Sequence, residues 1–336
     1  MGCESPPVEV VCLGEALIDF ICLEKGVSLA HARTFERAPG GAPANVAVAL
    51  ARLGVRSGFV GKVGDEEFGR FLASTLADNG VDTSALLFSD QARTALAFVS
   101  LKEDADRDFM FYRHPSADML IRKEEIDQDY IKRAKVFHFG SISLITEPSR
   151  GATLEAVRCA QEHGLIISYD PNLRLSLWPS ATGARRGIEL GWQFANVVKI
   201  SDDELAFLLG TSDPERGADR LLQPGLKLLA ISRGQEGCFF ATKEQRGYVP
   251  GYHVAAVDTT GAGDGFVAGL LAGLLDIGLQ VDSRKQILDV LRLANAVGAL
   301  TVTKRGAIPA FPTRNDVVQF MKEAYWGKGG EQAGKG

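Results

Sequence analysis

Short, mostly apolar segments that are typical of strands alternate with helical segments along most of this 336-residue chain. The apolar segments are residues 8–13, 57–63, 136–139, 165–169, 196–200 and 226–232. A strand that is apolar at consecutive residues suits a parallel sheet, because helices cover both faces of such a sheet. The alternation therefore predicts an α/β fold, with a doubly wound, mostly parallel sheet flanked by helices.

Several of the expected helices have recognisable starts and ends. Asp65 is expected to cap a helix that Gly80 ends. Ser201-Asp-Asp-Glu204 has the spacing of a capping box, in which Ser and Glu satisfy backbone N–H groups at a helix start. Residues 284–303 are apolar nearly all round, which predicts a buried helix.

One region departs from the alternation of strands and helices. Residues 93–101 and 108–113 alternate in polarity and are joined by the charged residues 102–107, which is the pattern of a β-hairpin. With parts of residues 21–39, this hairpin is expected to form a small β-sheet lid over a binding site. The lid side chains predicted to face that site are Phe98, Phe111 and Arg113. A plain edge hairpin with an aromatic-packed face is the alternative.

The stretch Asp258-Thr-Thr-Gly-Ala-Gly-Asp-Gly-Phe266 carries the densest set of functional residue types. Residues 252–257 alternate like a strand, and residues 266–275 are apolar, as in a buried helix. A strand is therefore expected to lead into a helix here. The turn glycines, the first helical N–H groups and the helix dipole together predict a phosphate site.

Asp264 is an acid at the mouth of this predicted phosphate site. A carboxylate repels phosphate, so a carboxylate at this position needs a reason. One reason is that Asp264 takes the proton from a hydroxyl that attacks a phosphoryl group. A helix cap is the alternative role for Asp264. A dinucleotide-binding turn is disfavoured because Phe266 stands where a small residue is required, and the Gly-Lys-Ser/Thr of a Walker A loop is missing.

Polar residues also follow other predicted strands, at the sheet edge where ligands collect in open α/β proteins. Asp19 lies beyond the strand of residues 8–13, and Asn45 follows a glycine pair in the first turn of a helix. Asp170-Pro-Asn-Leu-Arg174 places a cation after another strand. These residues suit sugar hydroxyls and phosphate oxygens. A solvated loop acid and a capping Asn are the alternatives for the first two.

Composition limits the classes of partner. The chain is 46% hydrophobic and 24% charged with a formal net charge of -5, which disfavours a broad nucleic-acid footprint. Its five cysteines show no Cys-x-x-Cys pair, and no apolar run has the length of a membrane span. We expect a cytoplasmic protein with no membrane or nucleic-acid partner, a single domain over residues 1–326, and a disordered tail from Gly327.

Taken together, these motifs resemble the ribokinase-like (pfkB) sugar kinase family and, within it, the fructokinases. The resemblance rests on Gly14-Glu-Ala-Leu-Ile-Asp19, Gly40-Gly-Ala-Pro-Ala-Asn45, Asp170-Pro-Asn-Leu-Arg174, Asp258-Thr-Thr-Gly-Ala-Gly-Asp264 and the loop at Gly306. It covers almost the whole chain. It implies a ribokinase-like fold and an ATP-dependent transfer of a phosphoryl group to a sugar hydroxyl, with D-fructose converted to fructose 6-phosphate as the expected reaction.

The resemblance also implies roles for individual residues. Catalysis falls to Asp264 as general base, the backbone N–H groups of Gly261, Ala262 and Gly263 as anion hole, and Arg174. Sugar binding falls to Asp19, Gly40, Gly41, Asn45 and Arg174. The nucleotide side comprises Ser201, Glu204, Ser232, Gly234, Gly237 and Asn295. Asp258, Thr260 and Gly306 match a monovalent-cation site for K⁺, and Glu204 would reach Mg²⁺ through water.

Some features leave other functions open. Ser201 stands where the family usually has Asn, so its contact with Mg²⁺ and phosphates is the least secure of these assignments. A 2-keto-3-deoxygluconate kinase is the nearest alternative, because Arg113 or Arg174 could pair with the carboxylate of an acid substrate. A non-catalytic sugar-binding regulator is the second alternative. A homodimer through the β lid is also expected.

Overall fold

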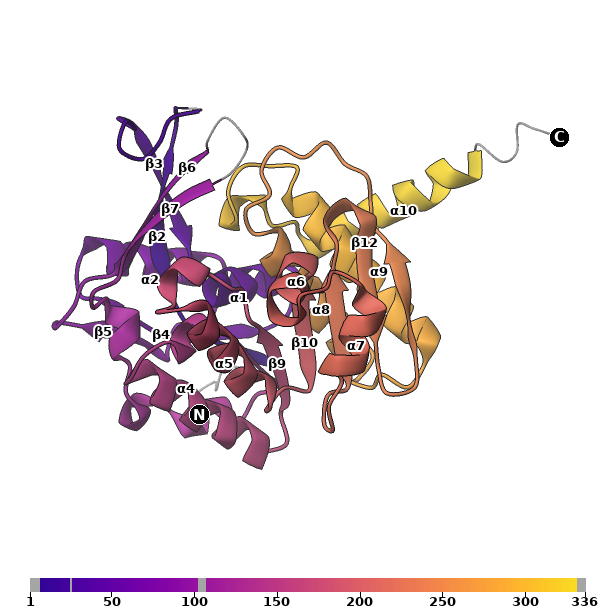
Figure 1. The fold of residues 1–336 in the computed structure, drawn as a ribbon, viewed down its shortest axis with the longest axis horizontal. Coiled ribbons are helices and arrows are strands. Elements are labelled where there is room, and N and C mark those ends of the chain that lie inside the picture. Colours follow the sequence, from indigo (N-terminus) through magenta and orange to yellow (C-terminus); the bar gives the residue numbers. More distant parts are fainter. Residues whose placement is uncertain (1–6, 25, 102–106, 331–336) are drawn as a thin grey trace, which may run out of the picture. The chain divides into compact units, whose positions relative to one another are not determined.

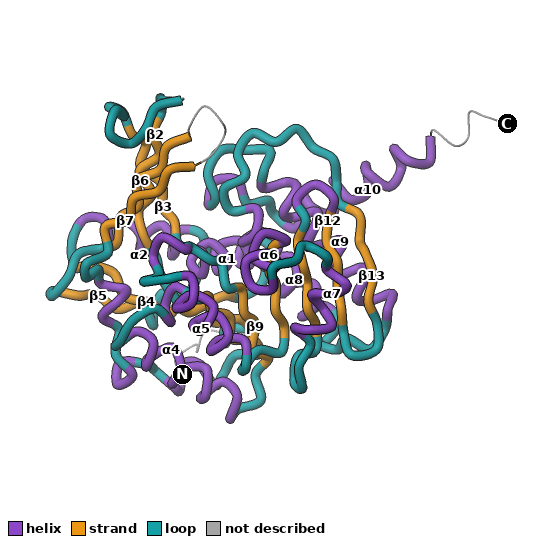
Figure 2. The backbone as a smooth tube through the Cα atoms, viewed as in Figure 1, coloured by secondary structure: helices purple, strands orange, loops and turns teal. Residues whose placement is uncertain are grey.

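A computed structural model describes residues 7–24, 26–101 and 107–330. The chain divides into two compact units. The first contains the residues up to Ala47 and Arg56–Phe194, and the second contains Val48–Val55 and the residues from Ala195 onward. In both units strands are combined with helices (Figures 1 and 2). That a single domain spans residues 1–326 stays a prediction.

The sheet of the first unit is parallel, as predicted. Its strands follow the order β9-β8-β1-β4-β5. They are β1 (Val10–Leu13), β4 (Ser57–Gly64), β5 (Leu86–Ser89), β8 (Val136–Gly140) and β9 (Ile166–Asp170). Every residue of β1, β4, β8 and β9 is buried, which explains why their sequences are mostly apolar or small.

The helices of this unit follow the strands. They are α1 (Ala42–Arg52), which continues into the second unit, α2 (Glu67–Asp78), α3 (Gln128–Ile131), α4 (Ser149–Glu162) and α5 (Ala181–Trp192). The predicted cap of α2 was wrong by one residue. The Glu66 side chain accepts the N–H of Phe68 at 2.8 Å, while Asp65 pairs with Arg70 at 2.6 Å. The helix begins at Glu67, so Glu66 is the N-cap residue and has an extended backbone.

A small second sheet lies in the same unit, in the order β3-β2-β6-β7. Its strands are β2 (Leu17–Cys22), β3 (Phe35–Gly40), β6 (Ala95–Leu101) and β7 (Arg107–Tyr112). β6 and β7 form the predicted antiparallel hairpin, and β2 joins β6 in parallel. The connecting residues 102–106 lie outside the described residues. Asp19 therefore belongs to a strand of the small sheet and not to a loop after β1.

Alternate residues give the small sheet two chemically different faces. Asp19 is opposite Ala97, which is opposite Phe111, so these three share one face. Phe20, Phe98 and Tyr112 lie on the other face, where the ring centroids of Phe20 and Phe98 are 5.0 Å apart. The prediction that Phe98 and Phe111 face one site was wrong, because the strand directs them to opposite faces. Phe98 belongs to an aromatic cluster.

The sheet of the second unit has the order β13-β12-β11-β10. Its strands are β10 (Val197–Ser201), β11 (Leu228–Ser232), β12 (Gly237–Ala241) and β13 (Arg246–Pro250), and its helices are α6 (Asp202–Leu209), α7 (Pro214–Leu221), α8 (Ala262–Asp276), α9 (Arg284–Thr301) and α10 (Arg314–Gly330). β10 and β11 are parallel, whereas β12 and β13 form antiparallel pairs that the sequence interpretation did not include.

The strand predicted for residues 252–257 does not form. This segment is irregular, and the last strand before α8 is β13. The N–H groups of Val257 and Asp258 both donate to the carbonyl of Val302, at 2.7 and 3.2 Å. The end of this segment is therefore held by one carbonyl after α9, and not by the ladder of a neighbouring strand.

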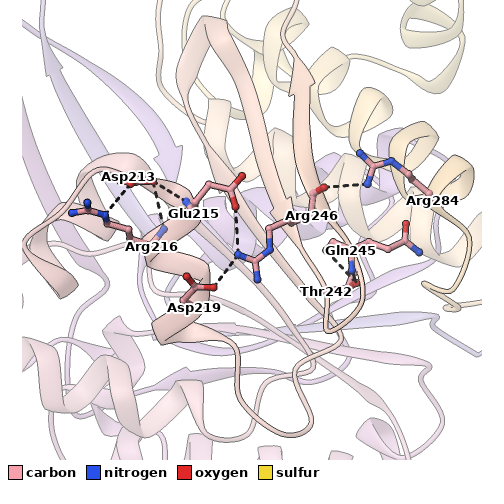
Figure 3. Close-up of polar contacts among 8 residues, drawn as sticks. All are labelled: Asp213, Glu215, Arg216, Asp219, Thr242, Gln245, Arg246 and Arg284. Atoms are coloured by element: carbon pink, nitrogen blue, oxygen red, sulfur yellow. Dashed lines mark hydrogen bonds and ion pairs between the residues drawn. The ribbon is translucent and has the colours of Figure 1, made fainter.

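Polar contacts fix the edge strand β13 to helices of its unit (Figure 3). The Arg246 guanidinium lies 2.9 Å from Asp219 and 3.4 Å from Glu215, both on α7. Arg284 of α9 donates to the carbonyl of Arg246 at 3.1 Å. Because the Arg246 side chain is 41% exposed, we expect these ion pairs to contribute little to stability.

Helix α8 packs closely on α9 through glycines spaced four residues apart. A β-carbon added to Gly269 would lie 2.8 Å from the Cα of Ala294, and one added to Gly273 would lie 3.1 Å from Val290 Cγ1. Gly265 contacts the Thr301 side chain in the same way. These contacts bring the two helix backbones together. The prediction that residues 284–303 form a helix apolar nearly all round was wrong, because one side of α9 is exposed and carries charged side chains such as Arg284, Asp289 and Arg292.

Helix α10 continues to Gly330, so the prediction of a disordered tail starting at Gly327 was wrong for the first residues of that tail. Once a helix has formed, each added residue gains one backbone hydrogen bond, which extends it beyond the amphipathic part. Residues 331–336 lie outside the described residues. The described cysteines, Cys12, Cys22, Cys159 and Cys238, are free thiols, and Cys3 lies outside them. No helix within residues 7–24, 26–101 and 107–330 is long and apolar enough to span a membrane.

Candidate active site

The start of α8 has a backbone geometry that only glycine accommodates. Gly261 is the N-cap of the helix and has φ +77°, in the left-handed region. A β-carbon at this position would lie 2.7 Å from the β-carbon of Ala307. Both the conformation and the space therefore require Gly261, and the first helical N–H groups follow it directly.

Asp264 lies in the first turn of α8 and is half-buried. It is the third helical residue, whereas Gly261 occupies the N-cap position, so Asp264 is not the helix cap. The helix dipole favours a negative charge at this position, which stabilises the carboxylate form needed to accept a proton. The arrangement suits the predicted general base beside an anion hole.

Lys199 brings a positive charge to the same place. It lies in β10, only 7% of its surface is exposed, and its Nζ is 3.1 Å from where a β-carbon on Gly263 would stand. An ammonium group beside helix N–H groups suits phosphate oxygens. The sequence interpretation missed Lys199. Its signal was a charged residue within an otherwise apolar strand, because a buried lysine needs an anionic partner or ligand.

Asp258 joins two loops of the second unit. Its Oδ1 accepts hydrogen bonds from the N–H and hydroxyl of Thr260 at 2.9 and 2.7 Å, and its Oδ2 accepts the N–H of Gly306 at 2.9 Å. The three residues predicted for a monovalent cation are therefore brought together. The loop after Gly306 also contacts Gly261 through Ala307.

Ser201 and Glu204 form the capping box that their spacing predicted. The Ser201 hydroxyl accepts the N–H of Glu204 at 3.1 Å, and Glu204 Oε2 accepts the N–H of Ser201 at 2.8 Å. Glu204 is buried at the start of α6. The cap fixes the orientation of this carboxylate, which is one of the hard oxygen donors that Mg²⁺ prefers.

The turn after β11 is shaped by two glycines. Gly237 has φ +99°, and a β-carbon there would lie 2.1 Å from the carbonyl oxygen of Val249. Gly234 has φ +53° and open space around its Cα. Ser232 precedes the turn, and its hydroxyl donates to the carbonyl of Ile200 at 3.3 Å. The turn exposes backbone groups at the end of β11, as expected for a nucleotide-side loop.

Asn295 has a structural role that the sequence interpretation did not include. Its Nδ2 donates to the carbonyls of Val249 and Pro250 at 3.3 and 3.2 Å, and the residue is buried. The amide therefore ties α9 to the end of β13. Its predicted place near the adenine of ATP stays a prediction.

In the first unit, the glycine pair lies against the residues that follow β1. Gly41 has φ +104°, and a β-carbon there would lie 2.3 Å from the carbonyl oxygen of Glu15. A β-carbon on Gly40 would lie 2.2 Å from Asp19 Oδ2. Asn45 is buried, and its N–H donates to the carbonyl of Gly41 at 2.9 Å. The predicted sugar contacts Asp19, Gly40 and Gly41 thus come together.

Arg113, at the end of β7, is buried in an ion pair with Asp118. The hydroxyl of Ser116 donates to the same carboxylate. Burial raises the pKa of Glu15 to about 7, and the positive charge of Arg113 opposes this rise. The sequence interpretation identified Arg113 but missed its carboxylate partner Asp118, which lies five residues further along the chain.

Arg174 differs from Arg113 in its surroundings. It is half-buried, and its Nη1 donates to the carbonyl of Leu173 at 3.1 Å. Within the described part of the chain it forms no ion pair. Asn172 precedes it with φ +44°, and the N–H of Asn172 donates to Asp170 at 3.0 Å, which fixes the turn. Arg174 therefore remains a cation for an anionic group.

Among residues 7–24, 26–101 and 107–330, no three or more His, Cys, Asp or Glu side chains gather in a cluster that could hold a metal ion.

Comparisons with known proteins identify the family. Residues 8–314 match the pfkB family carbohydrate kinase. The chain belongs to the pfkB carbohydrate kinase family. It is 53% identical to probable fructokinase-4 of Arabidopsis thaliana over 93% of this chain and 96% of that protein. It is 52% identical to fructokinase-2 of Solanum lycopersicum, again over 93% and 96% of the two chains.

Solved structures confirm the fold of this pfkB kinase. A fructokinase from Xylella fastidiosa with bound ATP superposes with a TM-score of 0.84 at 37% identity, covering 94% of this chain and 99% of the other. A fructokinase from Vibrio cholerae in complex with fructose, ADP and calcium gives a TM-score of 0.82 at 36% identity, with the same coverage. The predicted ribokinase-like α/β fold with its small sheet is therefore confirmed.

The predicted residues of this pfkB kinase divide between the two units. Those assigned to the sugar lie in the first unit, and those assigned to the phosphates, nucleotide and cation lie in the second. Asp264 and Arg174 were each assigned to both the sugar and the catalytic step, and Asp264 lies in the second unit whereas Arg174 lies in the first.

Proposed function

We propose that this chain transfers the terminal phosphoryl group of ATP to fructose, giving fructose 6-phosphate. The observation that carries the proposal is the start of α8. Asp264 lies in its first turn, shortly after Gly261, whose backbone has the left-handed conformation. This arrangement combines a proton acceptor with N–H groups suited to phosphate. The relatives named fructokinase support fructose as the sugar.

In the proposed reaction, the sugar hydroxyl attacks the phosphorus atom of the terminal phosphoryl group, and the bond to the ADP oxygen breaks. Asp264 takes the proton of the attacking hydroxyl. The N–H groups at the start of α8 and the Lys199 ammonium stabilise negative charge on the phosphoryl oxygens. Asp19, the glycine pair, Asn45 and Phe111 hold the sugar, so the protein contributes mainly positioning and charge.

The cofactor proposals follow from oxygen donors in the second unit. Glu204, oriented by its capping box, is our candidate for contacting Mg²⁺ through water. When bound with ATP, Mg²⁺ neutralises phosphate charge. Asp258, Thr260 and Gly306 are our candidates for a K⁺ site, since Asp258 holds their two loops together. Ser232, Gly234, Gly237 and Asn295 remain candidates for the nucleotide side.

The competing substrate is 2-keto-3-deoxygluconate, whose carboxylate would need a cation. Arg113 already forms a buried ion pair with Asp118, so its charge is matched within the protein. Arg174 lacks such a partner within the described residues and is the remaining candidate. A neutral sugar requires no further charge. We therefore propose fructose over the keto-acid.

A coupled assay that measures ADP release tests the proposed function. We expect a higher kcat/KM with fructose than with 2-keto-3-deoxygluconate, glucose or ribose. A higher kcat/KM with the keto-acid would show that the keto-acid is the substrate, and the proposed phosphoryl transfer would still stand. Sugar binding without ADP release from any of these substrates would support a non-catalytic sugar-binding regulator.

The small sheet is proposed to serve as a lid and as a dimer surface. Its Asp19 face would cover the sugar, while Met110 and Tyr112 on the other face are 43% and 56% exposed. Slower hydrogen exchange in β6 and β7 with fructose would support the lid. A dimer in light scattering that Tyr112→Glu converts to monomer would support the dimer surface, whereas a monomeric parent would refute it.

We also propose a cytoplasmic location, because the free thiols of the described cysteines suit a reducing compartment. Imaging of the chain with a fluorescent tag would test this, and an organellar signal would contradict it. One relative is named as chloroplastic.

A further inference from the structure

The start of α8 lies against a short segment of the same unit, residues 307–311. A β-carbon on Gly261 would lie 2.7 Å from the β-carbon of Ala307 and 3.4 Å from Phe311 Cε1. Ala307 is 4% exposed and Phe311 is 2% exposed, so neither can move without displacing its neighbours. The position of this segment therefore fixes the position of Gly261.

The segment is held on both sides by hydrogen bonds from outside it. Just before the segment, the N–H of Gly306 donates to Asp258 Oδ2 at 2.9 Å. At its other end, Arg52 Nη1 donates to the carbonyl of Phe311 at 2.8 Å. Arg52 lies 259 residues from Phe311 in the sequence, so this bond is a tertiary contact and not part of a local turn.

Arg52 is well placed to act as a fixed point. It is the last residue of α1 and belongs to the second unit, as Phe311 does. The residues shortly before it, Val48, Ala49 and Leu50, are fully buried, which holds this end of the helix in place. A hydrogen bond from a charged guanidinium is also about twice as strong as a bond between neutral groups.

We propose that Arg52 is a positioning residue for phosphoryl transfer, acting through residues 307–311 on the backbone at Gly261. The guanidinium fixes the end of the segment, and the segment fixes Gly261. The N–H groups that follow Gly261 stabilise charge only if they are held in the geometry of the transition state. The inference rests on the proposed function, since that function assigns the phosphates to the start of α8.

The expected signature is a loss of kcat while fructose binding survives. Arg52→Met keeps most of the length of the side chain and removes its N–H donors. Its kcat should fall about tenfold, as expected for the loss of one hydrogen bond from a charged group. The KM for fructose should change little, because the predicted sugar contacts Asp19, Gly40 and Gly41 lie in the first unit.

Two further variants separate positioning from general stability. Arg52→Lys keeps a charged donor, so its kcat should stay within about threefold of the parent. Arg284→Met is the matched control, because Arg284 Nη1 also donates to a backbone carbonyl of the second unit, that of Arg246 at 3.1 Å. Urea unfolding measures the stability of each variant, and Arg284→Met should leave kcat unchanged.

A double-mutant cycle tests the route through Phe311. Phe311→Leu removes the ring edge that lies against Gly261, so it should lower kcat by itself. If Arg52 acts through this residue, the double variant should lose less than the product of the two single losses. Should Arg52→Met fail to fold, Arg52→Gln, which keeps an uncharged amide donor, takes its place in the cycle.

A folded Arg52→Met protein with an unchanged kcat would overturn the inference, and so would losses that simply multiply in the double variant. A raised KM for fructose with an unchanged kcat would also count against it, because Arg52 would then act on the sugar site. Failure of the proposed function is a separate outcome, in which the parent itself would release no ADP with fructose.

Discussion

The Nζ atom of Lys199 lies 3.1 Å from where a β-carbon on Gly263 would stand. A strand residue thus brings a buried ammonium group to the first turn of α8, where Asp264 also lies. The site therefore combines the proposed general base and a cation within one turn of helix. The glycine keeps a side chain out of the space that the ammonium borders.

Lys199→Met tests the role of this cation, because methionine keeps most of the length and removes the charge. Hydrogen bonds to charged groups contribute about 1.5 to 3 kcal/mol, so kcat/KM for ATP should fall about 10- to 100-fold. Steady-state kinetics with varied ATP measures this. Lys227→Met is the matched control, since Lys227 is exposed just before β11 and should leave ATP kinetics unchanged. An equally active Lys199→Met protein would remove Lys199 from the site.

Asp264→Asn keeps the size of the side chain and removes the proton acceptor. A general base contributes about a hundred- to ten-thousandfold, so kcat should fall by at least about a hundredfold. ATP binding, measured by calorimetry, should survive because the helix N–H groups remain. A folded variant with kcat within about tenfold of the parent would leave the proton transfer to another group.

Gly261→Ala should combine backbone strain with a steric clash. Alanine in the left-handed conformation costs about 1 to 2 kcal/mol, and its β-carbon would also meet Ala307. Gly210→Ala is a matched control, since Gly210 has φ +69° at the end of α6 but nothing within 4 Å. Both variants should lose stability in urea unfolding. Only Gly261→Ala should also lose activity, on the order of a hundredfold, because it displaces the anion hole. Equal effects of the two variants on activity would contradict this role for Gly261.

The stability of the fold should depend on pH through Glu15. Its pKa is raised from 4.5 to about 7 in the folded state, so the folded chain holds a proton that the unfolded chain releases. Stability from this group is present below pH 4.5 and is lost as the pH rises to about 7. Glu15→Gln should therefore gain stability relative to the parent between pH 5 and pH 8, on the order of 1 to 3 kcal/mol. Urea unfolding at both pH values measures the gain. If the free energies of unfolding of the variant and the parent differed by the same amount at both pH values, the raised pKa would be contradicted.

Potassium should raise the activity of the parent, because Asp258 holds the Thr260 and Gly306 loops in a fixed arrangement. Rates in potassium chloride should exceed rates in tetramethylammonium chloride at equal ionic strength, which removes general screening as a cause. Asp258→Asn should lose this difference, because an amide cannot accept hydrogen bonds on both terminal atoms. Equal parent rates in the two salts would refute the cation site.

Much of the fold was predictable because burial on both faces leaves a clear sequence pattern. β1 and β8 are apolar at nearly every residue, and the capping box at Ser201 has a fixed spacing. The false strand at residues 252–257 shows the limit of this approach. Alternating polarity describes side chains, whereas a strand also needs a neighbour with which to form hydrogen bonds.

The candidate site was less predictable because its contacts join residues that are distant in sequence. Glu15 was not identified, since only the folded chain brings its carboxylate to the N–H of Ala42, 27 residues away. Phe98 and Phe111 both lie on the predicted hairpin. Their assignment to opposite faces required the register of β6 and β7, which the turn sequence does not fix.

The glycine contact between α8 and α9 also determines how accurately Asp264 is placed. Gly273 lies nine residues beyond Asp264 on the same helix, a distance of about 13 Å along its axis. Because Gly273 and Gly269 bring α8 against the backbone of α9, a larger side chain at either glycine would tilt the helix. The tilt would displace its first turn, so the precision of the proposed proton acceptor depends on two residues that touch neither substrate.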